Sequence, residues 1–354
     1  MGTKTKKPSI ARLPFGSRAI GIDLPSVVIA EIGINHEGSL EACHRLIEAA
    51  AIAGADAIKL QTADPEENFA PGTTSYELYR RAFLSPEATA EAFAHARHLG
   101  LEAFTTSGVA TFEWVDRLNP AAHKISSSTL FHFPLIRLGA RSGRTLLMST
   151  GMAELVDVDQ AVAWARQHGC RSLGTLQCTS LYPAPLETLD LAAIVHLRDR
   201  YRTPVGFSDH SLSVDAAAYA VAAGACFIEK HLTLDCGRPS FDHGISLDPA
   251  RFAAMVKEVR KVETLLGSPI KRLLPAVGEV ARRMRRYIVA ARDLPAGHRL
   301  GESDIRVMRV ADCRDGLSTK RVDELVGAVT KQPLARFAVF TEASVRFAAD
   351  KGAQ

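Results

Sequence analysis

Two histidines stand at the ends of two short apolar runs. One run leads into His210 within the segment 204–210 (PVGFSDH), and the other leads into His231 within 225–231 (ACFIEKH). Imidazole and carboxylate groups are common ligands of divalent metal ions. A single histidine at the end of a strand is more often a capping or core residue. The pair together indicates a metal site where two neighbouring strands end.

Polar side chains end the other apolar runs as well. Lysine supplies a positive charge, and serine and threonine supply hydrogen-bond donors, so a cluster of these types can hold a phosphate or a carboxylate. Taken singly, such a lysine could be a snorkelling side chain and such a serine a helix cap. The strand-end candidates are Glu31, Lys59, Gln61, Thr106, Lys124, Ser127, Ser149, Ser180, Tyr182, Ser208 and Glu229.

The elements that must position these side chains alternate between strands and helices. Nearly continuous apolar strands alternating with amphipathic helices predict a parallel sheet covered by helices. Eight such units in about 240 residues fit a (β/α)8 TIM barrel, whose active site lies at the C-terminal ends of the strands. A doubly wound open sheet is the alternative, but no glycine-rich phosphate loop follows the first strand. The predicted strands are Val27–Ile32, Ala57–Leu60, Leu101–Thr105, His123–Ile125, Thr145–Ser149, Leu173–Cys178, Pro204–Phe207 and Ala225–Ile228.

Helical periodicity is clearest between these strands. Ser39, Ser85 and Ser213 are the predicted N-caps of three of the helices. The predicted helices are Leu40–Ala53, Pro86–Leu99, Leu155–His168, Val214–Ala223 and Pro249–Leu266.

The pattern changes after Leu266. A basic stretch at 282–286 leads into short strands and turns from Tyr287 onward. We therefore predict a barrel domain over residues 1–282, and a linker with a small β-rich domain over 283–354. A unit of that size is marginal alone and usually needs a partner surface.

The composition is that of a globular protein. The chain has 354 residues, 47% of them hydrophobic, with a net charge of +4 and a pI near 8.7. This mild positive charge suits a small anionic substrate and does not favour nucleic acid. No apolar run reaches the ~20 residues that span a membrane. The six cysteines have no CxxC spacing, which indicates reduced thiols in a cytoplasmic protein; we expect Cys178 and Cys226 to be packing residues.

Seven segments, in their order and spacing, resemble the sialic acid (N-acetylneuraminate) synthase family. The resemblance covers nearly the whole chain, and the region from Tyr287 is similar to the family's antifreeze-like (SAF) domain. The segments are 30–36 (AEIGINH), 54–62 (GADAIKLQT), 147–152 (LMSTGM), 177–184 (QCTSLYPA), 208–210 (SDH), 229–231 (EKH) and 242–243 (DH).

The resemblance implies a condensation of phosphoenolpyruvate with an N-acetylated hexosamine such as N-acetylmannosamine. It implies a Mn²⁺ or Mg²⁺ ion held by His210 and His231, which would polarise the sugar aldehyde. It also implies a domain-swapped homodimer. Residues matching the phosphoenolpyruvate-binding positions are Lys59, Thr106, Lys124, Ser127, Ser149 and Ser208, with Ser180 where some members have asparagine; Glu31, Tyr182, Glu229 and Asp242 match positions around the sugar or the metal-bound water.

Three departures from the family pattern bear on the sugar. Thr129 stands where the family has an acidic residue, and Ser107 follows Thr106 in place of proline. The Arg-Pro-Gly turn of the small domain is missing, so Arg309 or Arg314 is the candidate to reach the sugar. A legionaminic or pseudaminic acid synthase, a 6-phosphorylated acceptor and a non-catalytic sugar-binding barrel are the alternatives. An enzyme making seven- or eight-carbon keto-acid phosphates is disfavoured by the SAF-like region. Glu31 and Asp242 are both candidates to handle the proton of the attacking water.

Overall fold

The chain divides into two compact units, Met1–Gly267 and Ser268–Gln354. The computed structural model describes residues 10–310, 313 and 315–347. The domain boundary predicted after residue 282 falls within the second unit, in helix α11 (Gly278–Met284). Within the described residues, no helix is both long and apolar enough to cross a membrane.

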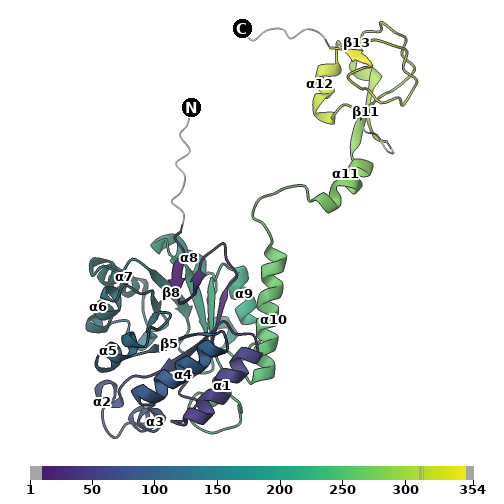
Figure 1. Ribbon diagram of the computed structural model, residues 1–354. Coiled ribbons are helices and arrows are strands. Elements are labelled where there is room, and N and C mark those ends of the chain that lie inside the picture. The colour runs from purple at the N-terminus through teal and green to yellow at the C-terminus, as the bar shows by residue number, and fades with distance from the viewer. Residues whose placement is uncertain (1–9, 311–312, 314, 348–354) are drawn as a thin grey trace. The chain divides into compact units, whose positions relative to one another are not determined.

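The first unit is a closed barrel of eight parallel strands, which confirms the predicted fold class. Strand β10 pairs with β3, so the last strand closes onto the first (Figure 1). Strand β3 is buried along its whole length, as expected for a strand covered on both faces. The strands are β3 (Val27–Gly33), β4 (Ala57–Gln61), β5 (Glu102–Thr106), β6 (His123–Ile125), β7 (Leu146–Ser149), β8 (Leu173–Cys178), β9 (Val205–Asp209) and β10 (Phe227–His231).

Helices surround the barrel, and side chains cap the beginnings of several of them. Ser39 and Ser85 accept hydrogen bonds from the third backbone N–H beyond them, as predicted. Helix α9 begins later than predicted, but Ser213 Oγ still accepts from Ala216 N at 3.1 Å. The helices are α1 (Leu40–Ile52), α2 (Pro65–Asn68), α3 (Thr74–Ala82), α4 (Pro86–His98), α5 (Val109–Arg117), α6 (Phe133–Arg141), α7 (Leu155–Gln167), α8 (Ala193–Tyr201), α9 (Ala216–Ala222) and α10 (Pro249–Leu266), with 3-10 turns η1 (Ser127–Thr129), η2 (Leu186–Thr188) and η3 (His243–Ile245).

A hairpin that precedes the barrel was not predicted from the sequence. Its strands, β1 (Leu13–Phe15) and β2 (Arg18–Ile20), pair antiparallel. Phe15 is fully buried and packs edge-on against Phe104 of β5, with ring centroids 5.4 Å apart. The hairpin therefore joins a core inside the barrel, which is distinct from the larger core between strands and helices. Fixing this end of the barrel leaves the opposite end for the site.

The second unit is small and built around short antiparallel strands. Its own core includes Ile288, Leu300 and Phe340. This confirms the predicted β-rich C-terminal region. Its elements are η4 (Pro275–Val277), α11, β11 (Arg286–Ala290), η5 (Glu302–Asp304), β12 (Ile305–Arg309), η6 (Thr319–Arg321), α12 (Val322–Leu325), β13 (Val329–Thr330) and β14 (Val345–Arg346).

Candidate active site

Successive side chains of a β-strand point to opposite faces, so alternate residues of each barrel strand point into the barrel. On β10, Glu229 and His231 line a pocket at the C-terminal ends of the strands, whereas the intervening Lys230 does not. Lys230 is also fully buried, but its Nζ lies 2.8 Å from Asp209 Oδ2, outside the pocket lining. Lys230 therefore differs from the buried Lys59, which lines the pocket. The two lysines point to opposite faces of the barrel wall, because successive side chains of a strand alternate between its faces.

Most of the predicted site residues line this one pocket. Ser180 is not among its lining residues, Arg309 belongs to the second unit, and Arg314 lies outside the described residues. The predicted residues that line it are Glu31, Lys59, Gln61, Thr106, Lys124, Ser127, Ser149, Tyr182, Ser208, His210, Glu229, His231 and Asp242.

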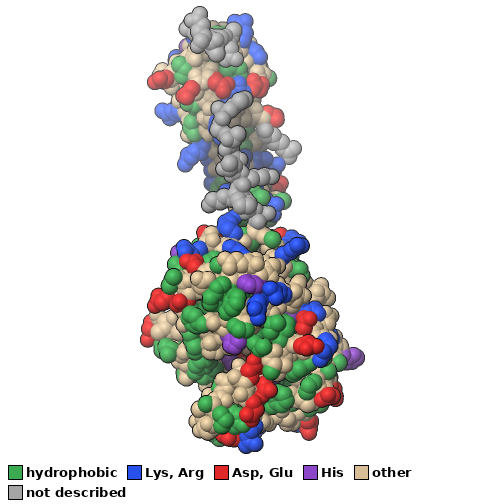
Figure 2. All heavy atoms as spheres, turned by 90° about the vertical axis from the view of Figure 1, so that its left-hand side faces the viewer, with side chains coloured by type: hydrophobic (Ala, Val, Ile, Leu, Met, Phe, Trp, Pro, Cys, Tyr) green, Lys and Arg blue, Asp and Glu red, His purple; other side chains and the backbone are tan. Residues whose placement is uncertain are grey.

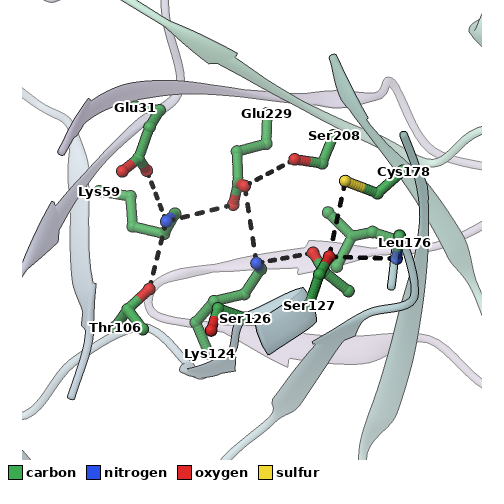
Figure 3. Close-up of polar contacts among 12 residues, drawn as sticks. Glu31, Lys59, Thr106, Lys124, Ser126, Ser127, Leu176, Cys178, Ser208 and Glu229 are labelled. Atoms are coloured by element: carbon green, nitrogen blue, oxygen red, sulfur yellow. Dashed lines mark hydrogen bonds and ion pairs between the residues drawn. The ribbon is translucent and has the colours of Figure 1, made fainter. Parts of the chain in front are cut away.

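Lys59 occupies the centre of the polar network (Figure 3). Its Nζ lies 2.6 Å from Glu31 Oε2 and 3.7 Å from Glu229 Oε2, and it donates to Thr106 Oγ1 at 3.2 Å. Burial disfavours the ammonium, but the charges of Glu229 and Glu31 outweigh it and raise the pKa of Lys59. Lys59 therefore stays a cation inside the pocket.

Lys124, on strand β6, also contacts Glu229. Its Nζ donates to Ser149 Oγ at 2.8 Å and lies 3.6 Å from Glu229 Oε1, which also accepts from Ser208 Oγ at 3.0 Å. Burial lowers the pKa of Lys124. Glu229 thus bridges the two ammonium groups (Figure 3), and each lysine reaches a hydroxyl group as well.

The two buried glutamates titrate in opposite directions. Burial raises the pKa of Glu31 to about 7, against the lowering effect of the Lys59 charge and with a contribution from Glu229. For Glu229, burial acts the same way, but the charges of Lys124 and Lys59 dominate and lower the pKa to about 2. Two carboxyl groups whose environments separate their pKa values are suited to different roles, one to proton transfer and the other to holding charge.

The two predicted metal ligands face the pocket close to each other. The ring centroids of His210 and His231 are 5.6 Å apart. The Nδ1 atom of His210 lies 2.8 Å from the carbonyl of Thr179, so a proton on Nδ1 would leave Nε2 as an electron-pair donor. Burial, with the charges of His210 and Lys59, holds the pKa of His231 well below its usual value, and its buried Nδ1 has no hydrogen-bond partner in the part of the chain that the structure describes.

Two histidines that each face the pocket with an available ring nitrogen fit a divalent metal ion. Within residues 10–310, 313 and 315–347, no group of three or more His, Cys, Asp or Glu side chains is arranged to hold one. The chain would therefore contribute His210 and His231, and the remaining positions would fall to oxygen atoms of water or substrate.

Asp242 joins the pocket from the loop before η3. Its backbone N–H donates to Asn35 Oδ1 at 3.0 Å, and its Oδ2 lies 3.6 Å from His231 Nδ1. Burial raises the pKa of Asp242. Gly33 (φ +56°) gives this cluster its room, because a Cβ there would lie 3.0 Å from Glu31 Oε1 and 3.5 Å from Asp242 Oδ2.

Tyr182, Ser180 and Arg309 differ from the other predicted residues in their surroundings. The Tyr182 ring packs at a tilt against His210 with centroids 4.4 Å apart and is 54% exposed, so it lies at the rim of the pocket. Ser180 lies near Gly151, and its buried Oγ has no hydrogen-bond partner among the described residues. Arg309 belongs to β12 of the second unit, where its Nε donates to the carbonyl of Arg283 at 3.0 Å.

Cys178, which we expected to be a packing residue, is buried and also contacts the pocket. It lines the pocket, where its sulfur accepts from Ser127 Oγ at 3.7 Å and lies 3.8 Å from His210 Nδ1. Its place as the last residue of β8 was the signal that could have identified it. The departures Ser107 and Thr129 also line the pocket.

The segment between β4 and α4 adds lining residues that the sequence analysis missed. Asn68, Phe69 and Tyr79 come from α2, α3 and the turn between them. The length of this segment, longer than a simple strand-to-helix connection, was the available signal.

The chain belongs to the NeuB family, whose profile matches residues 46–271, and the SAF domain profile matches residues 285–346. It is 33% identical to the N,N'-diacetyllegionaminic acid synthase of Legionella pneumophila over 88% of this chain and 92% of that protein. It is 34% identical to the pseudaminic acid synthase of Campylobacter jejuni over 85% of this chain and 91% of that protein. The crystal structure of an N-acetylneuraminic acid synthetase from Leptospira borgpetersenii superposes with a TM-score of 0.73 at 29% identity, covering 76% of this chain and 95% of that chain.

Proposed function

We propose that the protein condenses phosphoenolpyruvate with an N-acetylated amino sugar in its open-chain form and releases phosphate and a nonulosonic acid. The observation that carries the proposal is the pair Lys59 and Lys124, both buried in one pocket with Glu229 between them. Two buried ammonium groups surrounded by hydroxyl donors form a site for a small polyanion. N-acetylmannosamine and the diacetamido precursors of legionaminic and pseudaminic acids are the candidate acceptors.

The enclosed position of the two lysines favours a compact trianion such as phosphoenolpyruvate over a partner with an extended anionic surface. Charged side chains of both signs are interspersed over the face of the barrel unit in Figure 2, so its surface offers no broad basic patch in that view. Inside, Thr106, Ser149 and Ser208 already donate to or accept from the lysine–glutamate network. These groups would exchange partners with bound phosphate and carboxylate oxygens, which holds the enol carbon in place.

The condensation needs a polarised aldehyde and a proton path. When bound at His210 and His231, a divalent ion would act as a Lewis acid toward the acceptor oxygen. The new bond joins C3 of phosphoenolpyruvate to the aldehyde carbon, water adds at C2, and the C2–O bond to phosphate breaks. Glu31 is our candidate to take the water proton, since its carboxyl group titrates near neutrality within the pocket. Asp242, beside His231, is the alternative.

Phosphate release tests the proposal. The purified chain would be incubated with phosphoenolpyruvate, Mn²⁺ and each of a panel of sugars: N-acetylmannosamine, its 6-phosphate and diacetamido-trideoxyhexoses. We expect release that depends on both sugar and metal, and that is abolished in His210→Ala. Lys261→Met is the matched surface control, because Lys261 is 61% exposed and pairs with Glu258 of its own helix. Absence of release with every sugar would contradict the proposal.

We also propose that the protein acts as a domain-swapped homodimer. Support comes from an apolar segment of the second unit, where Ile270 is 71% exposed and Leu273 and Leu274 are each more than half exposed. Contiguous exposed apolar side chains favour burial against a partner. Sedimentation equilibrium would measure the mass, and a fully active monomer would contradict this proposal.

A further inference from the structure

Tyr79 connects helix α3 to the floor of the pocket. Thr73 caps the N-terminus of α3, and Tyr79 lies two turns into the helix with its ring packed on Phe69, the centroids 4.6 Å apart. Its hydroxyl donates a hydrogen bond to Gln61 Oε1. A helix in a surface connection thereby contacts a residue on a barrel strand.

This hydrogen bond and a second one hold the Gln61 amide from its two ends. An amide has one acceptor end and one donor end. Oε1 accepts from Tyr79, and Nε2 donates to Glu31 Oε1 at 2.9 Å. The other oxygen of Glu31 lies 2.6 Å from Lys59 Nζ. Tyr79 therefore acts on Glu31 through Gln61.

The contacts form a row with a charged end and a neutral end. From Lys124 the row passes through Glu229, Lys59 and Glu31, and Gln61 with Tyr79 ends it. The anionic substrate is attracted to the lysine end. The amide, the phenol and the Phe69 ring remain for the uncharged part of the acceptor.

The neutral end lies against the backbone of Gly33. A side chain there would crowd both partners, since a Cβ would lie 3.0 Å from Glu31 Oε1 and 3.2 Å from Gln61 Nε2. Rotation of the Gln61 amide would break its hydrogen bond to Glu31. The hydroxyl of Tyr79 is the group that holds this amide from its other side.

We propose that Tyr79 is a positioning and specificity-determining residue, which holds Gln61 against Glu31 and forms with Phe69 the wall that receives the acceptor sugar. This inference rests on the proposed function. It concerns the acceptor rather than phosphoenolpyruvate, because Tyr79 lies at the opposite end of the row from Lys124.

The test compares two tyrosines of the same helix. Tyr79→Phe keeps the ring and removes the hydroxyl. Tyr76→Phe is the matched control, since the Tyr76 hydroxyl bonds to Glu66 and Tyr76 does not line the pocket. For Tyr79→Phe we expect kcat/KM for the acceptor to fall about 10-fold, as for loss of one hydrogen bond to a buried network, with the KM for phosphoenolpyruvate unchanged. Tyr76→Phe should match the wild type.

A double-mutant cycle separates positioning from a general structural effect. In a Gln61→Ala background, Tyr79→Phe should cause little further loss, because the group through which it acts has been removed. Equal multiplicative losses in both backgrounds, or wild-type kinetics of Tyr79→Phe, would overturn the role of Tyr79 while leaving the proposed function intact. A wild-type chain that releases no phosphate with any acceptor would overturn both proposals.

Discussion

Replacing Lys124 by methionine should separate anion binding from folding. Lys124 is buried, donates to Ser149 and lies 3.6 Å from Glu229. Bound phosphoenolpyruvate would receive charged hydrogen bonds from this ammonium, each contributing about 1.5–3 kcal/mol. A loss of about 2–4 kcal/mol corresponds to an affinity about 30- to 700-fold weaker, since each 1.4 kcal/mol is about tenfold.

Lys124→Met should change the free energy of unfolding much less than it changes the affinity for phosphoenolpyruvate. The substitution removes a buried ammonium whose pKa is already lowered by burial, so its desolvation cost disappears with it. Glu229 keeps Lys59 at 3.7 Å and the hydroxyl of Ser208. We therefore expect the free energy of unfolding to change by less than about 2 kcal/mol, below the roughly 3–5 kcal/mol for removing the sole partner of a buried charge.

Two measurements on one variant check this reasoning. Calorimetric titration with phosphoenolpyruvate gives the affinity, and denaturant unfolding gives the stability. Lys261→Met should leave both unchanged, since exposed ion pairs contribute about 0–1 kcal/mol. A Lys124→Met variant that binds phosphoenolpyruvate within threefold of the wild type would refute the assignment of this lysine to the anion. A variant that does not fold would refute the argument that Lys59 compensates Glu229.

Three further predictions concern the metal, the barrel end and the second unit. His231→Ala should weaken Mn²⁺ binding, measured by calorimetry, by at least about 10-fold; unchanged binding would exclude this ligand. Phe15→Ala should lower the free energy of unfolding by about 3–5 kcal/mol, because it leaves a cavity beside Phe104; a loss under 1 kcal/mol would show that the hairpin is dispensable. Asp304 accepts from Gly301 N–H, His298 and an arginine, and these contacts lower the pKa of its carboxyl group although burial opposes them. The stabilising contribution of Asp304 is therefore complete above the ordinary carboxyl pKa and is lost as the pH falls through the lowered value. Asp304→Asn should reduce the free energy of unfolding at pH 7 and weaken the dependence of stability on pH below about 4. An unchanged acid unfolding profile would contradict this.

The sequence predicted elements well where a local pattern carries the signal. The strand His123–Ile125 and the helix Pro249–Leu266 have the predicted bounds, because apolar periodicity and the capping residue are read over neighbouring positions. The hairpin at Leu13–Ile20 was missed, since three-residue strands carry too short a pattern to recognise. Its stability comes from contact with Phe104, distant in the chain.

For the site, residue types at strand ends were sufficient to nominate most of the pocket. The contact of Cys178 with the pocket was missed because a cysteine in an apolar strand has the composition of a core residue, and its position at the strand end brings it to the pocket. Tyr79 was missed because its connection to Gln61 joins a helix to a strand and follows no sequence periodicity.

By itself, the sequence determined the barrel, the β-rich C-terminal region and the inventory of charged and hydroxyl side chains at the strand ends, since each of these depends on residue types in local order. Only the tertiary structure decided how these side chains combine. Closure of β10 onto β3 places Glu229 near Lys59 from the opposite end of the barrel sequence. The resulting burial separates the pKa values of Glu31 and Glu229. Such shifts depend on distance and desolvation in three dimensions, which no spacing along the chain contains.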